Sequence, residues 1–296
     1  MSANPTNPDE LEDSRAPFME HLEELRTRLV RCLLAIFIGG ALCWLVKEEL
    51  YQLITGPINE AQGDLGLKRE MIFRTPHGAF VLYLKLAVFG GLFLGIPVIL
   101  YQVWQFVAPG LYKHEQRVVL PFVFLSTACF AGGTIFCYNL ILPEVFTFLL
   151  GYGQDFGSPI ITLAKHTVVA AGQPNVDVGA AVLKADIAIE DFMGITTRLL
   201  LAFGLAFELP VALGFFALVG LITHHSLIKF WRYAVVIAFV VAAILTPPDP
   251  YSQAMLAIPL LALYGLSIGL AWMVHKRRSD AEAKAEADAD TKAGEG

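Results

Sequence analysis

The sequence predicts an all-α integral membrane protein with six transmembrane helices and both termini in the cytoplasm. Of the 296 residues, 56% are hydrophobic and only 16% are charged, whereas a soluble domain has about a quarter charged residues. The apolar residues gather in six runs, and a helix formed by such a run satisfies its backbone groups without water. Lys and Arg are more frequent in the segments that this topology places inside, as the positive-inside rule requires.

The chain is expected to begin with a disordered lead over residues 1–16, which is polar, acidic and rich in proline. An amphipathic helix follows from Pro17, because apolar residues recur there on one helical face while charged residues fill the other. Such a helix lies on the membrane surface. It leads into the first span, Leu29–Val46.

Five further spans are expected, because each apolar run is bounded by charged or turn-forming residues. They cover Ala79–Val107, Val118–Leu150, Leu199–Ile222, Tyr233–Leu245 and Ala254–Val274. The fifth span has only 13 residues and would extend about 20 Å as a helix. That length is too short for a hydrocarbon core of about 30 Å.

The segments between the spans are expected as loops. Lys47–Thr75 turns at Pro57, residues 151–190 form a partly ordered outer cap, and Thr223–Arg232 is a short basic loop on the inside. The Ala-, Glu-, Asp- and Lys-rich tail 279–296 is expected to be disordered. The membrane domain therefore covers residues 17–278.

The connection Gln102–Arg117, with the sequence QVWQFVAPGLYKHEQR, is dense in special residues. Pro109 is followed by glycine and marks the turn, since proline blocks helix continuation and glycine admits a positive φ. A short basic connection between two spans favours the cytoplasmic face.

Two carboxylates are expected at this face, Glu24 and Glu115. Together they could hold two guanidinium groups of a ligand through bidentate, charge-assisted hydrogen bonds, which lysine cannot reproduce. The alternative is local pairing. Glu24 and Arg28 have i,i+4 spacing, and Glu115 has Lys113 and Arg117 beside it.

Glu208 is the most anomalous residue, because an ionisable group deep within a span usually faces protein or a water-filled cavity. Pro210 follows it and is expected to bend the helix. One interpretation is a binding or proton-relay site, and a proton- or ion-coupled small-solute transporter that uses Glu208 is the alternative function. The other interpretation is a protonated core residue that is hydrogen-bonded.

Polar residues also mark the ends of the last two spans. Asp249 can cap span six through the free N–H groups at its start. Gln253 could contact another helix or bond within the bundle. The pair His224-His225 is a weak metal signal, and a solvated loop is the simpler interpretation. The sequence contains no GxSxG, HExxH, P-loop or GxGxxG motif in a strand–helix setting, so enzymatic chemistry has little support.

Four segments resemble the TatC family of the twin-arginine protein translocase, in the same order along the chain. They are HLEELRTRL at His21–Leu29, PVILYQVWQFVAPGLYKHEQR at Pro97–Arg117, FGLAFELPV at Phe203–Val211 and LTPPDPYSQ at Leu245–Gln253. The resemblance implies a glove-shaped, concave six-helix fold in the bacterial cytoplasmic (inner) membrane.

The resemblance also implies the function of a receptor for folded cargo with twin-arginine signal peptides. Glu24 and Glu115 would contact the paired arginines, although Glu23 beside Glu24 leaves open which carboxylate does so. Phe106 would line the same patch.

Glu208, Thr246 and Gln253 would engage the single-span partners TatA and TatB. The family transports cargo with the proton-motive force, without a cofactor, as homo-oligomers in complex with TatB. No nucleic acid is implied as a partner.

Overall fold

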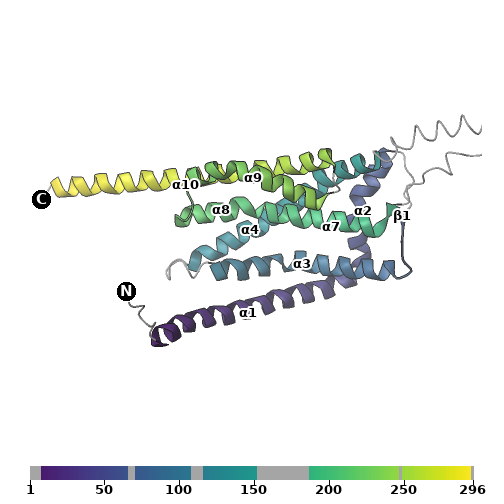
Figure 1. The fold of residues 1–296 in the computed structure, drawn as a ribbon, viewed down its shortest axis with the longest axis horizontal. Coiled ribbons are helices and arrows are strands. Elements are labelled where there is room, and N and C mark those ends of the chain that lie inside the picture. Colours follow the sequence, from purple (N-terminus) through teal and green to yellow (C-terminus); the bar gives the residue numbers. More distant parts are fainter. Residues whose placement is uncertain (1–7, 66–70, 108–115, 152–186, 247–248, 295–296) are drawn as a thin grey trace, which may run out of the picture. The chain divides into compact units, whose positions relative to one another are not determined.

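The computed structural model describes residues 8–65, 71–107, 116–151, 187–246 and 249–294 (Figure 1). Among these residues, six helices are long and apolar enough to cross a membrane. They cover His21–Leu45, Gly78–Phe106, Leu120–Gly151, Ile189–Val219, His224–Leu245 and Pro250–Lys276. The prediction of six spans is therefore confirmed, and the protein is a multi-pass membrane protein. The glove shape remains a prediction.

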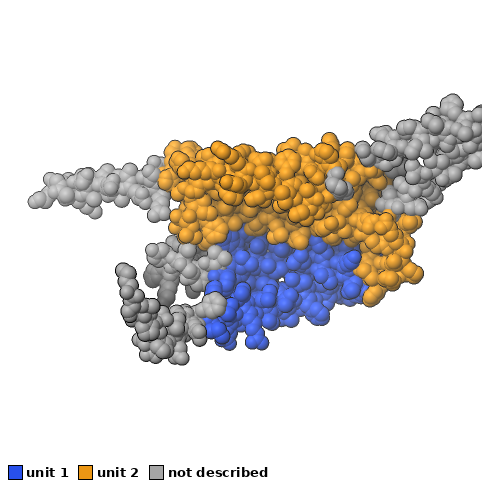
Figure 2. All heavy atoms as spheres, viewed as in Figure 1, with its two compact units in different colours: residues 1–50, 83–127 blue, residues 51–82, 128–296 orange. Residues whose placement is uncertain are grey.

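The chain divides into two compact units, coloured separately in Figure 2. The first unit comprises Met1–Leu50 and Tyr83–Thr127, and the second comprises Tyr51–Leu82 and Ala128–Gly296.

The first unit is built on α1 (Pro8–Leu45), α3 (Gly78–Val107) and the start of α4 (Gln116–Phe136). The backbones of α1 and α3 meet at glycines. A Cβ on Gly39 would lie 2.8 Å from the carbonyl oxygen of Gly91, so only a residue without a side chain permits this crossing. Close approach through small residues is the usual way in which membrane helices pack.

The second unit contains the remaining elements. They are most of α2 (Lys47–Asp64), β1 (Met71–Ile72), the end of α4, the π-helical turn η2 (Cys137–Ile141), β2 (Ile187–Ala188), α7 (Ile189–Ala206), α8 (Glu208–Val219), α9 (His224–Leu245) and α10 (Pro250–Gly294). The two short strands pair in parallel, with Met71 opposite Ile187. Helix α10 packs against α8 and α9, where the Tyr264 hydroxyl donates to the carbonyl oxygen of Leu227 at 2.8 Å.

The predicted loop with a turn at Pro57 is wrong, because Pro57 lies inside α2. Proline has no N–H to donate to the carbonyl of residue i−4, here Leu53. The Tyr138 hydroxyl donates to that carbonyl instead, at 2.6 Å. Gly56 makes room for it, since a Cβ there would lie 2.5 Å from the hydroxyl oxygen. The tyrosine therefore replaces the helical bond that proline removes.

The prediction of a short fifth span is also wrong. Helix α9 begins at His224 and has 22 residues, about 33 Å, which is enough to cross a core of about 30 Å. The segment predicted as a loop, Thr223–Arg232, is polar and basic, but all of it from His224 onward belongs to this helix. Thr223 caps it, with its hydroxyl accepting from the N–H of Ser226.

The terminal helices extend beyond the predicted membrane domain. Helix α1 already begins at Pro8, and α10 continues to Gly294, whereas the sequence predicted disorder over 1–16 and 279–296. Residues 1–7 and 295–296 of those segments lie outside the described residues. The polar, charged composition of these segments indicates only that they cannot form a packed core. A single helix needs no core, and Ala, Glu and Lys favour it intrinsically. Most of the predicted outer cap, residues 152–186, lies outside the described residues.

Candidate functional site

A polar cluster joins α1 and the end of α3 within the first unit. The His21 ring stacks on the Phe106 ring, with centroids 4.4 Å apart and an interplanar angle of 18°. His21 Nδ1 also lies 3.7 Å from Glu24 Oε2. The structure therefore connects Glu24 and Phe106, two residues that the family resemblance assigns to one binding patch, through a histidine between them.

Arg28 extends this cluster. Its Nε donates to Glu24 Oε1 at 3.0 Å, which is the local i,i+4 pair that sequence spacing offered as the alternative. Its Nη1 donates to Gln105 Oε1 at 2.9 Å and to Gln102 Oε1 at 3.4 Å. One guanidinium thus holds a carboxylate of α1 and two amide oxygens of α3.

The contacts of Arg28 show what a guanidinium finds in this cluster. A carboxylate oxygen and amide oxygens accept its N–H groups, and charge-assisted bonds of this kind are the stronger ones. The side chain of Glu24 is 36% exposed whereas that of Arg28 is 12% exposed. A carboxylate that remains open to solvent is available to a second cation.

Sequence reasoning did not include His21, Gln102 and Gln105 in the site. Helical spacing gave a partial signal, because residues three and four apart share a helix face. His21 and Glu24 have this spacing on α1, and Gln102, Gln105 and Phe106 have it on α3. The contact between the two helices is tertiary and leaves no such local pattern.

Two of the predicted residues of this region lie outside the described residues, namely Glu115 and the turn residue Pro109. The role of Glu115 as the second carboxylate of the pair therefore remains a prediction from the sequence.

Glu208 lies where the fourth span breaks. Helix α7 ends at Ala206 and α8 begins at Glu208. Pro210 has no N–H, and its ring would clash with the carbonyl of residue i−4 in a continuous helix, which explains the predicted bend. The Oε1 atom of Glu208 is shielded from solvent. The carboxyl therefore lies within the helix packing of the second unit.

The other predicted polar residues flank the turn between α9 and α10. The buried Thr246 donates its hydroxyl to the carbonyl oxygen of Ala242 at 2.9 Å. Asp249 Oδ1 accepts from the N–H of Ser252 at 2.7 Å, which is the geometry of an N-cap. Gln253 is partly buried in the first turn of α10. Thr246 and Asp249 thus end one helix and start the next.

The histidine pair His224-His225 opens α9 and does not lie in a loop. The ring of His275 from α10 joins it, 5.1 Å from the ring of His224. No group of three or more His, Cys, Asp or Glu residues suited to hold a metal ion is present in the described part of the chain.

Comparison with known proteins connects this geometry to one family. The family described as "Sec-independent protein translocase protein (TatC)" matches residues 20–259. The TatC protein of Koribacter versatilis is 37% identical over 273 residues, which cover 90% of this chain and 91% of the relative. That of Desulforapulum autotrophicum is 38% identical over 276 residues, with coverage of 93% and 92%.

A crystal structure of the twin arginine translocase receptor TatC superposes with a TM-score of 0.69 at 30% identity, covering 86% of this chain and 99% of that chain. These matches give no support to a small-solute transporter that uses Glu208. They span both units and every motif that the sequence analysis singled out. The chain therefore belongs to the TatC family of Sec-independent protein translocase components.

Proposed function

We propose that this protein is the receptor subunit of a twin-arginine translocase in the bacterial cytoplasmic membrane, with both termini in the cytoplasm. It binds the twin-arginine signal peptides of folded proteins and takes part in their export, which the proton-motive force drives. The observation that carries the proposal is the cluster of Glu24, His21 and Phe106 in a chain that superposes on a twin arginine translocase receptor.

Recognition of the paired arginines follows from the chemistry of this cluster. A signal-peptide guanidinium uses the partly exposed carboxylate of Glu24 and the aromatic faces of Phe106 and His21, since arginine stacks on aromatic rings as well as pairing with carboxylates. Glu115 supplies the second carboxylate for the second arginine. Lysine offers a point charge without the planar fork, so a Lys-Lys peptide binds much more weakly.

Partner binding is assigned to the second unit. Glu208, Thr246 and Gln253 engage the single-span partners TatA and TatB, and the protein forms homo-oligomers in complex with TatB. An acid at the start of α8 is expensive in a membrane unless it has a partner or a polar cavity. Glu208→Gln is expected to reduce co-purification of TatB, whereas Glu144→Gln, an exposed acid in the same unit, retains it. Equal co-purification by both variants would remove this assignment.

The receptor role is tested by crosslinking from a photoreactive residue at position 115 to a twin-arginine signal peptide, with the Lys-Lys peptide as control. A crosslink with the Arg-Arg peptide alone supports the proposal. Equal crosslinks, or none with either peptide, would contradict it.

A further inference from the structure

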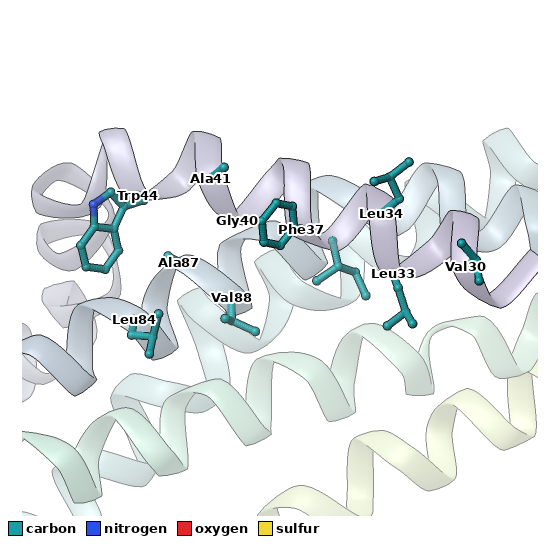
Figure 3. Close-up of a pocket in the computed structure, with 11 residues that line it drawn as sticks. Val30, Leu33, Leu34, Phe37, Gly40, Ala41, Trp44, Leu84, Ala87 and Val88 are labelled. Carbon is teal, nitrogen blue, oxygen red and sulfur yellow. The ribbon is translucent and has the colours of Figure 1, made fainter.

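An apolar trough runs along α1 within the first unit, with a volume of about 830 Å³. It is lined by residues of α1 between Val30 and Trp44 and by Leu84, Ala87 and Val88 of α3. Figure 3 shows Trp44 and Leu84 at one end and Val30 and Leu33 at the other. The trough lies within two membrane spans.

The trough is longer than one leaflet of a bilayer. From Val30 to Trp44 the helix rises about 21 Å at 1.5 Å per residue, whereas half of the hydrocarbon core is about 15 Å. An acyl chain that begins at the level of Trp44 therefore has apolar side chains beside it over its whole length.

The Trp44 end carries the features of a headgroup site. The Nζ atom of Lys47 lies 4.9 Å from the centre of the Trp44 ring and 5.7 Å from that of Tyr83. Trp and Tyr are enriched at the level of lipid headgroups, and lysine extends its charge to the same level. Among the described residues no ion pair engages Lys47, so its charge is available to a phosphate.

The walls of the trough favour a flexible chain over a partner helix. Membrane helices associate through small residues and interhelical hydrogen bonds. The small residue Gly40 already packs closely against α3, because a Cβ on Gly91 would clash with the backbone nitrogen of Gly40. The trough is bordered by long side chains such as Leu33 and Phe37, and Trp44 is the one lining residue with a hydrogen-bonding side chain.

We propose that this trough binds one anionic phospholipid, with its phosphate at Lys47 and an acyl chain along α1 towards Val30. A lysine near the membrane surface increases the affinity for anionic over zwitterionic lipid about fivefold. The site is distinct from the cluster of Glu24 and Phe106 and does not depend on the function proposed for it.

Quenching of Trp44 fluorescence by brominated lipids tests the proposal on the full chain in phosphatidylcholine nanodiscs. Brominated phosphatidylglycerol and brominated phosphatidylcholine are compared as minor components, and Trp44→Phe identifies the Trp44 signal among the four tryptophans. Half-quenching is expected at about a fivefold lower fraction of phosphatidylglycerol than of phosphatidylcholine. Lys47→Gln should abolish this preference, and Ala41→Phe, which fills the trough, should reduce quenching by both lipids.

Two matched variants control for charge and bulk. Lys229→Gln removes a lysine of α9 in the other unit, and Leu42→Phe enlarges the neighbour of Ala41 that does not line the trough. Both should behave as the unmodified chain. Equal quenching by the two lipids would mean ordinary boundary lipid and would overturn the proposal. Loss of all quenching in the assembled translocase would instead show that a membrane helix covers the trough.

Discussion

Arg28 donates to Glu24, with Nε 3.0 Å from Oε1, so the carboxylate assigned to the ligand already holds a guanidinium of its own chain. Both side chains come from α1, one helical turn apart. The contact neutralises part of the charge that would attract a signal peptide.

Removing this internal competitor should strengthen peptide binding. Solvent screens this pair because the Glu24 side chain is 36% exposed, and screened ion pairs contribute about 0.2–1 kcal/mol. Arg28→Gln is therefore expected to tighten the Arg-Arg peptide about 1.4- to fivefold. Titration with a fluorescent peptide at low salt measures the dissociation constant. Arg26→Gln removes the same charge from an exposed position of α1 and should change the dissociation constant less. Weaker binding by Arg28→Gln would mean that Arg28 supports the site and does not compete for it.

Neutralising Glu23 and Glu24 in separate variants identifies which of these two carboxylates contacts the peptide. A hydrogen bond to a charged group contributes about 1.5–3 kcal/mol, so Glu24→Gln should weaken binding by a factor of about ten or more. Glu23→Gln should have little effect, because the ion pairs with His21 and Arg28 are made by Glu24. The same titration checks both variants, and a larger loss for Glu23→Gln would reverse the assignment.

Sequence alone was sufficient for the number of spans, because long apolar runs have few alternatives, but it began the fifth span nine residues too late. It failed at α2, where Gly56 and Pro57 have the local pattern of a turn. The helix continues through them because Tyr138, distant in sequence, contacts Leu53. The same limit applies to the site. Spacing predicted the pair of Glu24 and Arg28, whereas the His21–Phe106 stack depends on how α1 and α3 pack.

Two adjacent glycines of α4 should respond oppositely to alanine. A Cβ on Gly133 would lie 2.6 Å from the carbonyl oxygen of Phe203 and 2.7 Å from Cγ of Phe207, whereas a Cβ on Gly132 meets nothing within 4 Å. Gly133→Ala should therefore cost about 1–3 kcal/mol of unfolding free energy, the usual range for overpacking. Gly132→Ala should be neutral or stabilise by up to about 1 kcal/mol through helix propensity.

Thermal unfolding of the purified protein in detergent compares the two alanine variants directly. A lower melting temperature for Gly133→Ala alone supports the close crossing of α4 and α7. Equal melting temperatures would show that the two helices can separate without cost.

The bond between Tyr138 and Leu53 leads to the last prediction. Tyr138→Phe keeps the ring but removes the hydroxyl that donates to the Leu53 carbonyl oxygen. Pro57 has no N–H, so that carbonyl has no helical partner to replace the hydroxyl. Side-chain hydrogen bonds in membrane proteins contribute about 0.6–1.7 kcal/mol, so the melting temperature should fall by a few degrees, at about 2–4 °C per kcal/mol. Tyr233→Phe, at an exposed position of α9, is the matched control and should not change it. The double variant Tyr138→Phe with Pro57→Ala should recover most of the lost stability, because the N–H of alanine at position 57 can donate to the Leu53 carbonyl oxygen. If the double variant is no more stable than Tyr138→Phe alone, the tyrosine does not substitute for the missing helical bond.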